Sequence, residues 1–120
     1  EITREKEGSK KRIPSSTNAK KRHRPTFVVD LHIHQLTDST IGMTNFDMLN
    51  KQLDTARGQL EFAIKKRMPK MVFIHGVGAG VLRQELEYLL KRYDAVSFED
   101  ANFQKYGRGA TEIYIHQSKL

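Results

Sequence analysis

Residues 71–83, MVFIHGVGAGVLR, decide how the sequence is interpreted. A short apolar run stops at His75, three glycines follow, and an apolar pattern with leucine then resumes. We interpret these parts as a strand, a turn and the start of a helix. Gly76, Gly78 and Gly80 permit backbone conformations that leave N–H groups free to face an anion at the helix start. The motif therefore predicts either a phosphate-binding loop with His75 at its lip or a plain tight turn.

The rest of the chain continues the pattern of alternating strands and helices. A long helix is predicted to begin at the capping-box-like pair Thr44 and Asp47 and to end before Pro69. A second helix is predicted at 80–93, and strands are predicted at 27–32, 70–75, 95–101 and 110–116. We expect an α/β fold, more narrowly an α+β two-layer sandwich of order βαβαββ, with a four-stranded mixed sheet and two helices on one face.

The charge divides the chain into two parts. Residues 1–26 contain nine Lys/Arg and three Glu, so +6 of the net charge of +7 lies there. This segment is poor in large apolar residues, and we expect a disordered basic tail or linker that either touches phosphates or is only solvated. One domain is expected over residues 27–120. Because the chain starts at Glu1, we expect it to be attached to further domains of a longer protein.

Two absences narrow the class of protein. The chain contains no cysteine, which excludes disulfides and suits a reducing compartment, so a cytoplasmic location is expected. No stretch has the run of apolar residues needed for a membrane span or a secretion signal, so no membrane partner is expected.

Asp30 and His32 lie on the first strand, two residues apart and on one face. Parallel pairing of strands 27–32 and 70–75 would bring them near His75. An aspartate can orient a histidine for proton transfer near neutral pH. The alternative is an aspartate that caps the strand beside a half-exposed histidine.

Residues 30–34, DLHIH, are also similar to a metal motif on the first strand of barrel hydrolases. Such a barrel needs about 250 residues, and a closed site needs further ligands on other strands. We therefore expect no metal site. A nucleotide-hydrolysing P-loop is disfavoured too, because GVGAGVLR lacks the Lys-Ser/Thr pair that reaches phosphates and magnesium.

The loop KYGRGAT, residues 105–111, is a third candidate element. Gly107 and Gly109 flank Arg108, whose guanidinium suits bidentate contact with phosphate. The alternative is a glycine-rich turn with an exposed arginine.

Together these three motifs resemble the small MutS-related (Smr) domain family. The family pattern has three parts, which are found here at 30–32, 75–83 and 107–111. They are DLH, then HGxG before a helix that starts with Leu-Arg, and finally a glycine loop that runs into Ala-Thr. The resemblance covers roughly residues 27–115. It implies a fold similar to the C-terminal domain of translation initiation factor three, with the last strand antiparallel and inserted between the second and third. The Arg108 turn would then abut the His75 turn.

The resemblance also implies nucleic-acid binding, of DNA or RNA, with endonuclease activity. By this resemblance, Asp30 and His32 would be the catalytic pair, and His75, Gly76 and Gly78 would belong to the loop on the phosphate side. The glycine motif itself adds His75 as a proton-transfer group at the lip of the site and Gly80 as a further phosphate-binding residue. Arg83, Lys105 and Arg108 are the cations expected to contact phosphate. No cofactor is implied for RNA, where the 2′-hydroxyl could attack; with DNA, water must attack and magnesium becomes an option.

Two positions differ from the common family pattern. Many members have Gly directly after DLH, and many have a cation inside HGxG, where this chain has Ile33 and Val77. A noncatalytic module that binds structured or branched nucleic acid therefore remains an alternative, and a protein-interaction domain is a third hypothesis.

Overall fold

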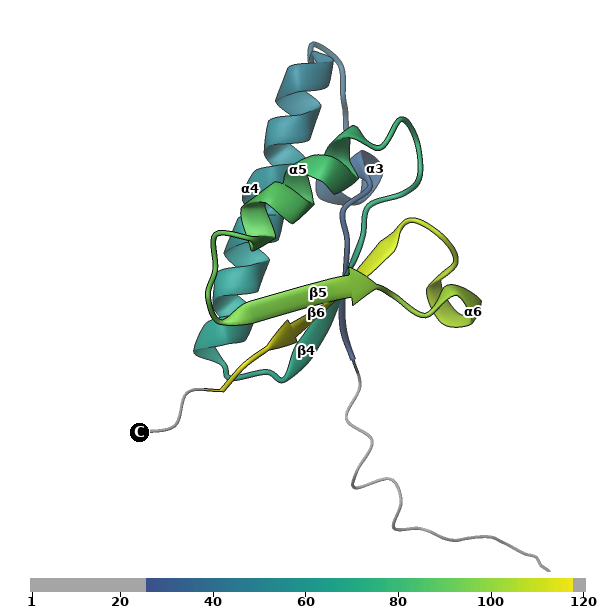
Figure 1. Cartoon of the computed structure of the whole chain (residues 1–120). Coiled ribbons are helices and arrows are strands. Elements are labelled where there is room, and N and C mark those ends of the chain that lie inside the picture. Colours follow the sequence, from purple (N-terminus) through teal and green to yellow (C-terminus); the bar gives the residue numbers. More distant parts are fainter. Residues whose placement is uncertain (1–25, 118–120) are drawn as a thin grey trace, which may run out of the picture.

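The chain folds around a four-stranded sheet in the computed structural model, which describes residues 26–117 (Figure 1). The expected basic tail lies outside the described residues except for Thr26. The elements are β3 Phe27–Asp30, α3 Ile33–Leu36, α4 Asn45–Lys65, β4 Lys70–Ile74, α5 Val81–Leu90, β5 Val96–Asp100, α6 Phe103–Tyr106 and β6 Ala110–Ile115. The predicted order of four strands and two longer helices is confirmed. Two helices of four residues, α3 and α6, lie in segments for which the sequence predicted neither a helix nor a strand.

The sheet has the strand order β3-β4-β6-β5. Strands β3 and β4 are parallel, and β6 is antiparallel to both of its neighbours. Asp30 pairs in register with Ile74, which pairs with Ala110. The insertion of the last strand between the second and third, which the family resemblance implied, is confirmed. The ends of β3, β4 and β5 therefore meet the start of β6 at one edge of the sheet.

Helix α4 begins at the capping box that the sequence predicted. The backbone N–H of Thr44 donates to Asp47 Oδ2 at 2.9 Å, and the N–H of Asp47 donates to Thr44 Oγ1 at 3.0 Å. These bonds satisfy donors that a helix start otherwise leaves without partners. Ala56, Leu60 and Ala63 form the buried stripe of the helix.

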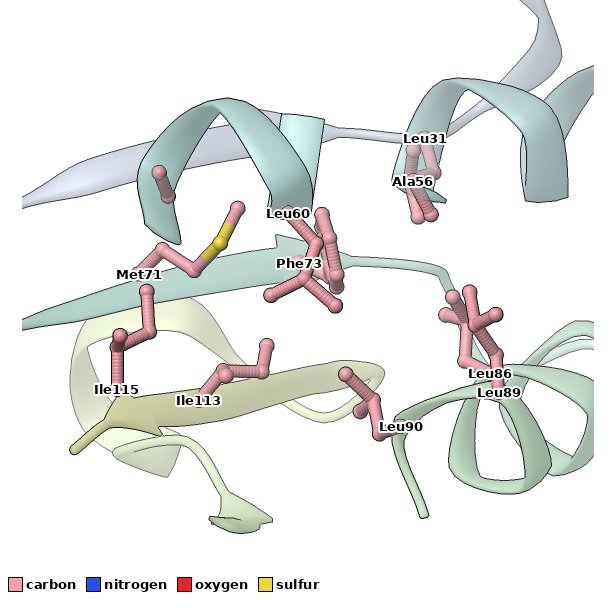
Figure 2. Close-up of a cluster of buried hydrophobic side chains, with 11 residues drawn as sticks. Leu31, Ala56, Leu60, Met71, Phe73, Leu86, Leu89, Leu90, Ile113 and Ile115 are labelled. Atoms are coloured by element: carbon pink, nitrogen blue, oxygen red, sulfur yellow. The ribbon is translucent and has the colours of Figure 1, made fainter. Parts of the chain in front are cut away.

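The main core lies between the sheet and the layer formed by α4 and α5 (Figure 2). Side chains alternate across β4, so Met71 and Phe73 pack in this core while Val72 lies in a cluster on the other face. The prediction that both long helices cover one face is confirmed. On the second face, Tyr106 of α6 packs against the smaller cluster, whose buried members are Val72, Ala101 and Ala110.

Candidate active site

Two glycine-containing loops meet where β4 ends and β6 begins. The carbonyl oxygen of Gly109 accepts hydrogen bonds from the backbone N–H groups of His75 and Gly76, both at 2.9 Å. Gly109 has a φ of 62°, and a Cβ atom on it would lie 2.6 Å from the carbonyl carbon of Gly76. Glycine permits this close approach because it has no side chain. The structure thus brings together two loops that the sequence singled out separately.

A carboxylate–imidazole pair, Asp30 and His32, ends β3. Asp30 Oδ1 accepts a hydrogen bond from the backbone N–H of His32 at 2.9 Å and lies 2.7 Å from its Nδ1. The bond to the backbone turns the chain, which explains why β3 ends at Asp30 rather than at residue 32 as predicted. In neutral His32 the proton lies on Nδ1, facing the carboxylate, and Nε2 keeps its lone pair. The side chain of His32 is 53% exposed, so a substrate can reach it.

His32 lies against the backbone of Gly76. A Cβ atom on Gly76 would be 2.8 Å from His32 Nε2, so the imidazole occupies space that any side chain at position 76 would need. Gly76 also contacts Gly109. All three motifs therefore surround Gly76, which is the convergence that the sequence predicted.

His75 is placed differently from the expectation that it stands at the lip of the site. It is only 6% exposed, with Nδ1 2.9 Å from the carbonyl oxygen of Gly76 and Nε2 2.8 Å from Thr111 Oγ1. A carbonyl only accepts, so Nδ1 donates to it, and the Thr111 hydroxyl donates to Nε2. Burial lowers the pKa of His75 below 6.5, although the bond to the Gly76 carbonyl opposes this shift. His75 is therefore buried within the turn, and both of its ring nitrogens already have hydrogen-bond partners.

The turn before α5 offers free backbone donors, but Gly76 is not one of them. Its N–H is bonded to Gly109, which corrects the expectation that this amide holds phosphate. Among residues 26–117, no acceptor is bonded to the N–H groups of residues 77–79. Gly80 is the N-cap of α5 with a φ of 84°, so these donors precede a helix start. Free amides and the helix dipole both favour an anion there.

Arg83 and Arg108, two predicted phosphate-binding residues, have opposite surroundings. Arg83 donates from Nε to Glu87 Oε2 at 3.2 Å and from Nη2 to Asp100, so carboxylates already offset its charge. Arg108 is exposed, and no described carboxylate forms an ion pair with it. Arg108 is therefore the arginine that is available to a ligand at the loop contact.

A cleft of about 440 Å³ opens between the two loops, on the side of β5 and β6. Lys105 is exposed on α6 and does not line this cleft. Its Nζ lies 5.4 Å from the centroid of the Tyr106 ring. Two residues here were not predicted as site residues from the sequence. Phe103 lines the cleft, and the alternation of β6 places Thr111 on the same face as Ile113. The lining includes Gly76, Val77, Gly80, Phe103, Gly107 and Arg108.

The sequence matches the model of the Smr domain over residues 42–116. This region is more than half of the chain and contains both loops. The chain belongs to the Smr family. It is also similar to the crystal structure of the Smr domain of Thermus thermophilus MutS2, with a TM-score of 0.60, 28% sequence identity, and coverage of 77% of this chain and 100% of that chain. No curated protein matches the sequence.

Asp30 and His32 precede the region of this Smr domain that matches the family model. The contact between His32 and Gly76 ties them to that region. Within residues 26–117, no three side chains of His, Cys, Asp or Glu gather closely enough to hold a metal ion. Nor does that part of the chain contain a helix with the length and apolar character needed to cross a bilayer.

Proposed function

We propose that this Smr domain binds nucleic acid and cleaves its phosphodiester backbone, with His32 as the proton-transfer residue. The observation that supports this most is the position of His32 Nε2, which lies against Gly76 at the start of the loop with free amides. Smr domains generally bind nucleic acid, and some members are nucleases. An imidazole oriented by a carboxylate beside an anion-binding loop suits general base catalysis at a phosphodiester.

In the proposed complex, a backbone phosphate lies on the N–H groups of residues 77–79. Arg108 offsets its charge from the neighbouring loop. Asp30 keeps the proton of neutral His32 on Nδ1, which leaves Nε2 able to accept a proton from the nucleophile. His75 donates a hydrogen bond to the carbonyl oxygen of Gly76, and Thr111 fixes the imidazole of His75, so together they hold the Gly76 backbone in place.

With RNA, Nε2 of His32 accepts the proton of a 2′-hydroxyl, and the 2′-oxygen attacks phosphorus. The bond from phosphorus to the 5′-oxygen breaks, and that oxygen takes a proton from solvent. With DNA, a water molecule replaces the 2′-hydroxyl as the nucleophile. Magnesium prefers oxygen ligands, and the carboxylates at this edge, Asp30 and Asp100, are bonded to His32 and Arg83. These residues do not fit a magnesium site, so no step here uses one.

The test is cleavage of labelled single-stranded RNA and of supercoiled plasmid by the purified full chain, with and without EDTA. We expect cleavage of at least one substrate and a loss of about 100-fold or more in His32→Ala. His34→Ala is the matched control, because His34 is also exposed but lies on α3. Equal activity of His32→Ala and wild type would exclude the proposed role of His32. Failure of the wild type to cut either substrate would exclude the nuclease proposal.

Binding without cleavage is the second candidate function. Val77 favours it, because this apolar residue is 60% exposed in the loop where many family members carry a cation. Such a module would bind nucleic acid with the salt dependence of phosphate contacts, and His32→Ala would bind as the wild type does. The same cleavage assay, combined with a binding assay, separates the two functions.

A further inference from the structure

Phe103 is an exposed aromatic residue beside the proposed phosphate site. It is 61% exposed and lines the cleft together with Arg108 and Val77. Exposure alone does not distinguish it, since Phe46 on α4 is 70% exposed. The difference is that Phe103 shares a concave surface with Arg108, which pairs with no described carboxylate, and with the loop that precedes α5.

The short helix α6 holds Phe103 in a defined place. Asn102 caps the helix through a hydrogen bond from the Lys105 N–H to its Oδ1 at 3.0 Å. Tyr106, at the other end, packs against the apolar cluster beneath the sheet. Figure 1 shows α6 beyond the end of β5, in the connection that leads to β6. A short segment anchored at both ends presents its phenyl ring with little loss of conformational freedom when a ligand binds.

The cleft is continuous with the proposed phosphate site. Gly76, Val77 and Gly80 belong to the turn before α5 and also line the cleft. His32 follows the end of β3, on one side of β4, whereas Arg108 and Phe103 precede β6, on the other side. A phosphate on the turn would therefore have His32 on one side and the cleft on the other, so the next nucleoside along the strand would extend toward Phe103.

We propose that Phe103 and Arg108 hold an unpaired nucleobase in this cleft, so that the preferred ligand is single-stranded nucleic acid. The inference rests on the proposed phosphate site. The cleft volume of about 440 Å³ lies in the usual range for small organic ligands. Stacking of a base on an aromatic ring needs a free base face, which a duplex provides only when the base is flipped out. Arginine adds cation–π and electrostatic attraction.

The test measures binding without depending on cleavage. A fluorescein-labelled single-stranded oligonucleotide and a hairpin duplex of the same composition are titrated with the full chain, and anisotropy gives each Kd. We expect tighter binding of the single strand by wild type. Phe103→Leu should weaken single-strand binding about ten-fold, with little change for the duplex. Phe103→Tyr should retain binding, and Phe46→Leu is the matched control.

The outcomes separate this inference from the proposed function. Wild-type binding that is equal for single strand and duplex, or unchanged in Phe103→Leu, would overturn the base-holding role while leaving phosphate binding intact. Binding of His32→Ala at the wild-type Kd, with loss in Phe103→Leu, would support the role even if no cleavage is seen. No binding of either nucleic acid by wild type would overturn both. If Phe103→Leu shows altered circular dichroism, an abasic nucleotide placed in the oligonucleotide tests the same contact with unaltered protein, and an unchanged Kd at every abasic position would refute it.

Discussion

The imidazole of His32 fills the space beside Gly76 at the edge of the sheet, where a Cβ atom on the glycine would lie 2.8 Å from the imidazole Nε2. The glycine also has a φ of 81° and donates its N–H to Gly109. One residue without a side chain thus joins the imidazole to both loops. This close contact leads to the first prediction.

Gly76→Ala should displace the His32 ring and strain the backbone at a positive φ. We expect a loss of about 1 kcal/mol or more in the free energy of unfolding and a fall of about 100-fold in the cleavage rate. Urea unfolding and the RNA cleavage assay measure the two effects. Gly58→Ala is the control: Gly58 lies in α4, and a Cβ atom added to it would have open space around it, so we expect a gain of about 0.5–1 kcal/mol and unchanged cleavage. Cleavage by Gly76→Ala at the wild-type rate would show that the reaction does not depend on this contact.

The second prediction concerns pH and the buried His75. Its pKa is lowered on folding, chiefly by burial, so the unfolded chain binds a proton more readily than the folded one. The contribution of His75 to stability is therefore fully present above pH 6.5 and is lost as pH falls through the lowered pKa.

Urea unfolding at a series of pH values tests this. We expect the free energy of unfolding to decrease below pH 6.5. The slope that this one group contributes is at most about 1.4 kcal/mol per pH unit. His75→Gln removes the titrating group, so the decrease should become shallower in that variant. The same pH dependence in both proteins would assign it to other groups.

The third prediction concerns the ion pair between Arg83 and Asp100, which lies in the lining of the cleft. Asp100→Asn removes a negative charge and partly frees the arginine, so we expect nucleic acid to bind several-fold more tightly. The slope of log Kd against log salt concentration should increase by about one, the change expected for one additional phosphate contact. Arg57→Gln on α4 removes a charge that is paired with Asp54, and serves as a control with little expected effect. Weaker binding by Asp100→Asn would mean that the pair holds the cleft in shape rather than masking a cation.

The sequence predicted the fold well wherever the signal was local. Thr44 and Asp47 lie three residues apart and form their capping box within one helical turn. The alternation of β6 and the apolar spacing of α5 are equally local, because each reflects which face of one element is buried. The strand order required the family resemblance, since no local pattern states where the last strand is inserted.

The site was harder to predict because its contacts join distant residues. The sequence marked His75 by its motif, but its hydrogen-bond partner Thr111 lies 36 residues further along the chain. Likewise, Arg83 looked available until the fold placed Asp100 beside it. Phe103 lies between the predicted strands 95–101 and 110–116. No helix was predicted there because the four-residue helix α6 is too short to show periodicity, although Asn102 was a readable cap.

The position of β6 affects when the site can appear during synthesis. β6 follows every other described element in the chain, yet it lies between β4 and β5. A growing polypeptide that has already made α4, β4 and α5 cannot yet bring Gly109 against Gly76, and Arg108 has no fixed place. A fragment that stops before β6 therefore lacks the contact between the two loops on which the proposed site depends.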